Sequence, residues 1–214
     1  VAEELEYLLR DAGARGIVYH STFAPVLAEV LPRLPDLQVL LQVGDGSGGA
    51  LLPGAEWYED ALAAQPAELA PDLVESWSPD DLYILYTGGT TGQPKGVLWR
   101  NADANLECFG ASRATTITDV VAAAEGTLRA LLAPPFMHGA GHWMALRTWN
   151  QGGTVIIQHH TDHLDAHDVW STAARERCNF VLIIGDAFAR PLLDALDEHE
   201  YDLSALTVLL SGGA

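Results

Sequence analysis

Residues 86–96 read Tyr86-Thr-Gly-Gly-Thr-Thr-Gly-Gln-Pro-Lys-Gly96, and this stretch decides the fold. Its last ten residues hold four glycines and a proline, which excludes a regular helix or strand. Glycine lets the backbone approach a ligand closely, and successive N–H groups can then converge on phosphate oxygens. Apolar and aromatic residues flank the stretch at Asp81–Tyr86 and Val97–Arg100. We therefore expect a phosphate-binding loop between two strands.

The polar side chains of this loop suit the same ligand. The hydroxyls of Thr87, Thr90 and Thr91 can bond phosphate or contact a magnesium ion, and Lys95 adds a positive charge on a long stem. The lysine stands between a proline and a glycine, so the loop is not a Walker A motif, which needs Gly-Lys-Ser/Thr. A flexible glycine turn is the alternative. We favour the phosphate loop because threonines, proline and lysine all stand at suitable positions.

Strand and helix signals alternate along the rest of the chain. We expect strands at Gly16–Tyr19, Gln38–Val43, Leu131–Ala133, Thr154–Gln158, Phe180–Gly185 and Leu206–Leu210. We expect helices around Leu5–Leu9 and at Pro25–Leu34, Trp57–Ala64, Asn101–Phe109, Trp143–Asn150, Asp165–Arg177 and Ala189–Glu198, with a loop before the last one and Pro191 near its start. This order predicts an α/β fold of parallel-sheet layers with flanking helices and right-handed crossovers.

Composition restricts the partners. The chain has 11 Lys and Arg against 29 Asp and Glu, and this net charge of −18 repels nucleic acid and anionic lipid. Local N–H groups and one lysine can still hold a phosphate. No apolar run reaches the roughly 18 residues that span a bilayer, although peripheral membrane contact stays open. Two cysteines, Cys108 and Cys178, are too few for a disulfide framework and favour the cytoplasm.

Two further glycine-containing segments are candidate ligand contacts. In Leu132-Ala-Pro-Pro-Phe-Met-His-Gly-Ala-Gly141, the proline pair forces an extended entry and the glycines leave room around His138. In Val208-Leu-Leu-Ser-Gly-Gly-Ala214, an apolar strand runs into a loop whose backbone can lie against a flat ligand. Taken alone, the first segment suits a histidine with a structural role, and the second segment suits the ordinary end of a strand.

The loop at residues 86–96 resembles the phosphate loop of the adenylate-forming superfamily, which includes acyl-CoA synthetases, firefly luciferases and the adenylation domains of peptide synthetases. The match is unbroken over eleven residues, with Gly88 where many relatives have serine. Val97-Leu-Trp-Arg100 and Gly185-Asp-Ala-Phe-Ala-Arg-Pro191 are similar to acyl-CoA synthetases of the fatty-acid or steroid-acid type, the former to actinobacterial ones. The resemblance is strong over Leu82–Ala214 and weak before that.

The resemblance implies an AMP-forming ligase. A hydrophobic carboxylic acid attacks the α-phosphorus of ATP, giving an acyl-adenylate and pyrophosphate, and the thiol of coenzyme A then displaces AMP. Mg2+ would share the phosphate charge, with Thr90 as its contact. The implied nucleotide contacts are Thr87, Gly88, Gly89, Thr90, Thr91, Gly92, Lys95, Gly212, Gly213 and Ala214. The implied acid contacts are Phe136, Met137, His138, Gly139 and Trp143.

The resemblance also implies that residues 1–214 are part of the N-terminal domain of such an enzyme. The adenylation lysine would lie in a C-terminal domain outside them, so we expect no catalytic residue here, and an inactive, poorly folding piece if it is made alone. Two alternatives stay open: a domain that loads an amino or aryl acid onto a carrier protein, and a non-catalytic nucleotide-binding remnant. Acyl chain length, the choice between fatty and steroid acid, and oligomeric state are not determined.

One histidine-rich stretch suggests zinc. It reads His159-His-Thr-Asp-His-Leu-Asp-Ala-His-Asp168, and a continuous helix would align three of its histidines. However, Asp165 with Asp168 reads as a reciprocal N-cap pair, and Leu164 with Val169 resembles a hydrophobic staple. A helix would then begin at about residue 166. We expect a loop followed by a helix, and no stoichiometric metal bound by this stretch.

Overall fold

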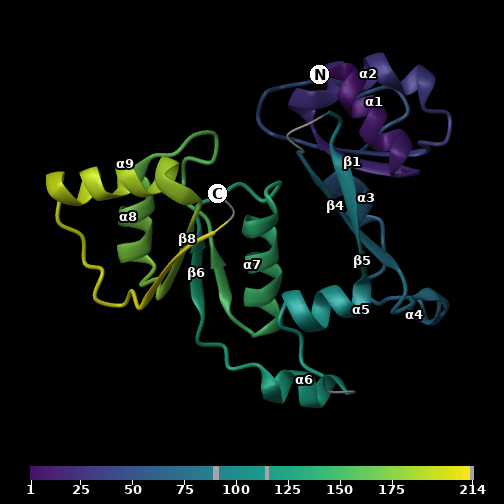
Figure 1. The fold of residues 1–214 in the computed structure, drawn as a ribbon. Coiled ribbons are helices and arrows are strands. Elements are labelled where there is room, and N and C mark those ends of the chain that lie inside the picture. The colour runs from purple at the N-terminus through teal and green to yellow at the C-terminus, as the bar shows by residue number, and fades with distance from the viewer. Residues whose placement is uncertain (89–91, 114–115, 213–214) are drawn as a thin grey trace. The chain divides into compact units, whose positions relative to one another are not determined.

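The computed structural model describes residues 1–88, 92–113 and 116–212. It divides into two compact units (Figure 1). The first comprises Val1–Ser78 and Ile84–Leu98, and the second comprises Pro79–Tyr83 and Trp99–Ala214. Each unit has a parallel sheet with helices packed against it, which confirms the α/β prediction. No helix in the described ranges is both long and apolar enough to cross a membrane.

The first unit is built on the parallel sheet β1-β2-β3. Its elements are α1 (Ala2–Asp11), β1 (Gly16–His20), η1 (Ser21–Phe23), α2 (Ala24–Val30), η2 (Leu31–Arg33), β2 (Val39–Val43), β3 (Glu56–Trp57), α3 (Tyr58–Ala63) and α4 (Pro71–Ser76). Leucines of α1, α2 and β2 form its core, including Leu27 and Leu40. Pro25 lies near the start of α2, where the fixed φ of proline suits the first helical turn. The short helix α4 was not predicted, because prolines surround its sequence.

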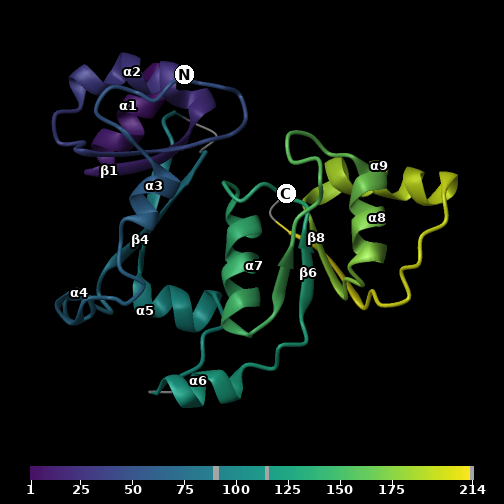
Figure 2. The same ribbon diagram turned by 180° about the vertical axis from the view of Figure 1, so that it is seen from behind.

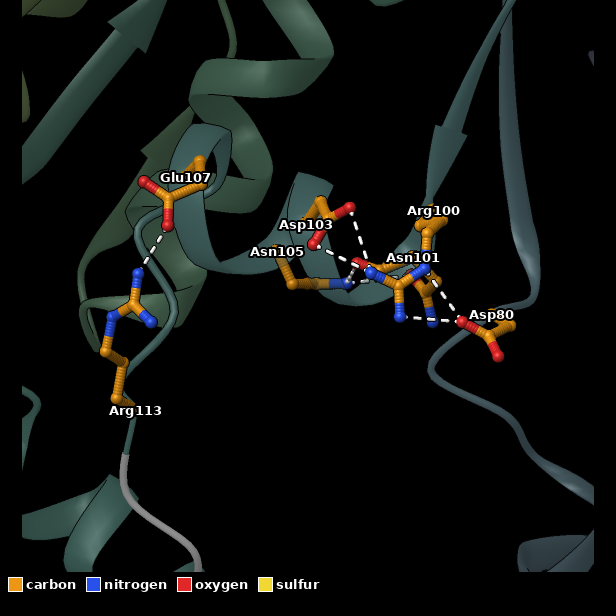
Figure 3. Close-up of polar contacts among 7 residues, drawn as sticks. All are labelled: Asp80, Arg100, Asn101, Asp103, Asn105, Glu107 and Arg113. Carbon is orange, nitrogen blue, oxygen red and sulfur yellow. Dashed lines mark hydrogen bonds and ion pairs between the residues drawn. The ribbon is translucent and has the colours of Figure 1, made fainter.

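Strands β4 (Leu82–Thr87) and β5 (Lys95–Arg100) pair as a two-stranded sheet, as expected for the arms of the glycine–threonine loop. Figure 3 shows how the two arms are tied at their base. The guanidinium of Arg100 bonds Asp80 at 2.7 Å and Asp103 at 3.2 Å. The N–H of Asn101 donates to the carbonyl of Asp81 at 2.7 Å. The predicted helix after β5 forms as α5 (Asn101–Asp103) and a π-helical turn, η3 (Ala104–Cys108).

The second unit carries the four-stranded parallel sheet β7-β6-β8-β9. Its strands are β6 (Arg129–Leu132), β7 (Thr154–Ile156), β8 (Phe180–Ile183) and β9 (Val208–Ser211). Its other helices are α6 (Ile117–Ala123), α7 (Gly139–Asn150), α8 (Ala166–Arg175) and α9 (Gly185–Glu198). Helix α7 covers one face of the sheet, and α8 and α9 cover the other (Figures 1 and 2).

Alternation along the strands explains this two-sided cover. Leu131 and Val181 point to the core under α8 and α9, whereas Leu132 and Leu182 point to the core under α7. Successive strand residues face opposite sides, and a parallel sheet must bury both. The near-continuous apolar strands β6 and β8 therefore lie at the centre. Strand β9 lies at the edge, where its apolar side chains are each nearly half exposed.

Helix α9 corrects one prediction. We expected a loop before a helix at Ala189–Glu198, with Pro191 near the start of that helix, but the helix already begins at Gly185, so Pro191 lies well inside it. Proline lacks the N–H that would bond a carbonyl one turn earlier. The apolar face of α9 tolerates this loss because the next residue, Leu192, is fully buried against the sheet. Tertiary packing therefore overrides the local stop signal.

Candidate functional site

The glycine–threonine loop belongs to the first unit. Residues 89–91, which include the predicted contacts Gly89, Thr90 and Thr91, lie outside the described residues. On the β4 side, Thr87 and Gly88 are exposed, and a Cβ added to Gly88 would meet no atom within 4 Å. On the β5 side, Gly92 has φ +108° and Lys95 is exposed. Open backbone next to an exposed ammonium group can accept an anion.

Lys95 is the single lysine in the 214-residue sequence. Its position is fixed by the strand that begins with it, since β5 runs from Lys95 to Arg100. Gly96, the next residue, has a packing role instead of a ligand role. A Cβ at Gly96 would come within 2.9 Å of the Ile84 side chain and 3.2 Å of the Tyr86 ring. The glycine therefore lets the two strands and the Tyr86 ring pack closely beside Lys95.

Helix α1 holds both arms of the loop, a feature that sequence reasoning missed. Tyr7 Oη donates to the carbonyl oxygen of Pro94 at 3.0 Å. Tyr86 Oη donates to Asp11 Oδ2 at 2.6 Å, and this hydrogen bond to a carboxylate raises the pKa of Tyr86 to about 12. Tyr7 and Asp11 are four residues apart, so they lie on one face of α1. Only the helical spacing in residues 2–11 hinted at this arrangement.

The second unit carries the predicted acid-binding loop, and His138 has a clear structural position in it. It is the N-cap of α7, and its Nδ1 accepts the N–H of Ala140 at 3.2 Å. Because Nδ1 accepts, the proton of the neutral ring is on Nε2. Gly139 is the first residue of α7, Phe136 is half-buried, and Met137 is 88% exposed. The loop thus presents an apolar side chain beside an imidazole donor.

Trp143 forms a network with two residues that were not predicted, Tyr83 and His142. Trp143 Nε1 donates to Tyr83 Oη at 2.8 Å, and Tyr83 Oη contacts His142 Nε2. His142 Nδ1 lies 3.0 Å from the carbonyl oxygen of Phe136 and donates to it, since a carbonyl only accepts. Burial raises the pKa of Tyr83 and keeps its hydroxyl protonated. Trp143 therefore supports the loop, and its ring packs edge-on against Trp99.

A cavity of about 350 Å³ opens beside the same loop. Its walls come from the end of β6, the segments that follow β6 and β7, and α9. They are mainly apolar, and they include Pro135, Phe136 and Phe188, with the side chain of Gln158 among the polar exceptions. Gln158 Nε2 donates to the carbonyl oxygen of Ala133 at 3.1 Å. Of the five predicted acid contacts, Phe136 lines this cavity.

The glycine segment after β9 is described as far as Gly212, while Gly213 and Ala214 lie outside the described residues. Gly212 N–H donates to the carbonyl of Ile183 at 3.2 Å, and Ser211 Oγ accepts the N–H of Gly185 at 3.0 Å. These bonds fasten the end of β9 to the β8–α9 junction. In parallel sheets, ligands bind outside the carboxyl ends of the strands, which is where this segment and the histidine loop lie.

The histidine-rich stretch folds as predicted into a loop followed by a helix. Asp165 caps α8, because its carboxylate accepts the N–H of Asp168 at 3.0 Å, and this bond is the main reason its pKa is lowered. In the predicted reciprocal pair, the carboxylate of Asp168 would accept the backbone N–H of Asp165. Asp168 Oδ2 instead accepts the N–H of His160 at 2.7 Å. Three histidines are therefore not aligned on one helix.

Comparisons with known proteins agree on one family. Residues 1–214 match the family model described as AMP-binding enzyme. The medium-chain acyl-CoA ligase Mig of Mycobacterium avium is 46% identical over 223 residues, covering 100% of this chain and 40% of that protein. The 3-oxocholest-4-en-26-oate–CoA ligase of Rhodococcus rhodochrous is 34% identical over 230 residues, with the same coverage. The chain thus spans 40% of the length of these relatives.

Solved structures agree on the fold. The N-terminal domain of FACL13 from Mycobacterium tuberculosis superposes with a TM-score of 0.72 at 23% identity, covering 100% of this chain and 48% of that one. A Mycobacterium tuberculosis fatty acyl CoA synthetase gives a TM-score of 0.71 at 22% identity, covering 100% of this chain and 38% of that one.

Proposed function

Since this chain belongs to the family of AMP-binding enzymes, we propose that the protein is an AMP-forming ligase. It activates a hydrophobic carboxylic acid with ATP and transfers the acyl group to coenzyme A. Residues 1–214 are part of its N-terminal domain, and it acts in the cytoplasm, where ATP and coenzyme A are its co-substrates. The observation that carries the proposal is the open backbone at Gly88 and Gly92, on the two sides of the glycine–threonine loop, together with the exposed Lys95 that begins β5. The relatives named as acyl-CoA ligases support it.

The loop would bind the phosphates of ATP. Backbone N–H groups from Thr87 to Gly92 would surround the β- and γ-phosphates, with Lys95 adding its charge. The open space at Gly88 and the positive φ of Gly92 suit this role. The Mg2+ that accompanies ATP would neutralise the leaving pyrophosphate, with Thr90 as the proposed contact. Phosphoryl-type chemistry of this kind depends mainly on positioning and charge neutralisation.

The second unit would bind the acid and the adenine ring. The Nε2–H of His138 can donate to the carboxylate, while Phe136, Met137, Gly139 and the Trp143 ring form the apolar surroundings. The cavity of about 350 Å³ would take the alkyl or ring portion. Each buried CH2 contributes about 0.8 kcal/mol, which favours hydrophobic acids. Gly212, Gly213 and Ala214 would lie against the adenine ring.

Mass spectrometry of the products tests the proposal. The full-length protein is incubated with ATP, Mg2+, coenzyme A and a panel of fatty, steroid, aryl and amino acids. We expect AMP and the coenzyme A thioester of a fatty or steroid acid. A clear preference for an amino acid, or an acyl-adenylate that coenzyme A never converts, would point to a carrier-loading enzyme. No adenylate from any acid would indicate a nucleotide-binding remnant.

A further inference from the structure

A second group of ligating side chains lies at the junction of α8 and α9, within the second unit. His167 is in the first turn of α8, Glu198 is the last residue of α9, and His199 is the extended C-cap that follows. His167 Nε2 lies 3.3 Å from Glu198 Oε2, and the rings of His167 and His199 are 4.9 Å apart. One nitrogen or oxygen from each residue lies within 4.8 Å of the other two.

These distances suit a metal ion. Zinc bonds imidazole nitrogen and carboxylate oxygen at about 2.0–2.2 Å in tetrahedral geometry, so neighbouring ligand atoms stand roughly 3.4 Å apart. The pair formed by His167 and Glu198 already has that separation. The side chain of His199 is exposed and can rotate to complete the set. Two imidazoles and a carboxylate leave the fourth position to water.

Tyr201 orients the first of these ligands. His167 Nδ1 lies 2.5 Å from Tyr201 Oη, which turns Nε2 toward Glu198. A metal on Nε2 leaves the proton on Nδ1, and this N–H then donates to the tyrosine oxygen. Partners of this kind fix the tautomer and ring orientation of metal-binding histidines. We propose that His167, Glu198 and His199 bind Zn2+ or a similar borderline divalent ion, which ties the start of α8 to the end of α9.

Among the described residues, one other group has comparable spacing: His160, Asp162 and His163. Its three side chains are exposed in a single loop, and His163 Nδ1 already pairs with Asp162 at 3.0 Å. The proposed site differs because it joins two helices and includes an orienting tyrosine. The proposed site includes one residue of the histidine-rich stretch, His167. The expectation that this stretch binds no stoichiometric metal is therefore revised for His167 alone. The loop group supplies the matched control.

Calorimetric titration of the chelator-treated, full-length protein with zinc tests this site. We expect one tight equivalent, weakened by at least about tenfold in His199→Ala and in Glu198→Gln and by about tenfold in Tyr201→Phe. His163→Ala should bind zinc as the wild type does. Zinc should also raise the melting temperature of the wild type and not that of His199→Ala. No binding, unchanged binding in His199→Ala, or loss of the equivalent in His163→Ala would each overturn the proposal.

Discussion

The hydroxyl of Tyr7 donates a 3.0 Å hydrogen bond to the carbonyl oxygen of Pro94, the residue directly before Lys95. Together with the bond from Tyr86 to Asp11, it fastens both arms of the glycine–threonine loop to α1. A loop that is already ordered loses less entropy when a ligand binds. Helix α1 therefore helps to hold a loop that lies about 80 residues later in the sequence.

Tyr7→Phe should weaken ATP binding by the full-length protein with little effect on kcat. A typical hydrogen bond contributes about 0.5–1.5 kcal/mol, which corresponds to a KM for ATP raised by roughly 2- to 12-fold. Steady-state kinetics at saturating acid and coenzyme A measure this. Tyr58→Phe, on α3 in the same unit, is the matched control. An unchanged KM for ATP would contradict a role of Tyr7 in ordering the loop.

Lys95→Ala should reduce adenylation without unfolding the domain. The lysine is exposed, so folding does not depend on it. A hydrogen bond to a charged group contributes about 1.5–3 kcal/mol, and its loss should slow ATP–pyrophosphate exchange by about 10- to 150-fold. Arg190→Ala also removes an exposed positive charge and should leave the rate unchanged. Exchange by Lys95→Ala within about threefold of wild type would refute the assignment.

Asp165→Ala should destabilise the protein by about 1 kcal/mol, because the N-cap of α8 loses its acceptor. Asp165→Asn keeps an acceptor oxygen and should cost much less. The folded-state pKa of Asp165 is lowered, so its charge stabilises the fold above its unfolded-state pKa, and this contribution is lost as the pH falls through the folded-state pKa. Denaturant unfolding of wild type and Asp165→Asn should therefore differ at neutral pH and converge in acid. A constant difference would contradict this reading.

Gly141→Ala should damage the histidine loop. A Cβ there would stand 2.8 Å from the carbonyl oxygen of Pro135 and 3.0 Å from that of Pro134. Because both obstacles are backbone atoms, we expect a loss of about 1–3 kcal/mol of stability and weaker acid binding. Thermal melting and the KM for the acid measure the two effects. Gly44→Ala, where the same atom would meet nothing within 4 Å, should behave as wild type.

Local sequence determined several features by itself. The loop between β4 and β5 follows from four glycines and a proline, and the start of α8 follows from Asp165 placed three residues before Asp168. The central strands β6 and β8 follow from short apolar runs. In each case the responsible groups are at most a few residues apart. The cap of α8 forms without a distant partner, whereas the apolar runs mark strands that are completed only by pairing within the sheet.

Only the tertiary structure decided which distant residues meet. Tyr7 and Pro94 are 87 residues apart, Tyr86 and Asp11 are 75 apart, and Tyr83 and His142 are 59 apart. Pro191 shows the same limit, because packing of Leu192 keeps α9 helical past a residue that locally favours a break. Such contacts depend on how the sheets bring separate elements together, and the spacing of residues along the sequence does not predict this arrangement. The sequence thus predicted the glycine–threonine loop between β4 and β5, while the fold supplied Tyr7 and Asp11, which hold its two arms.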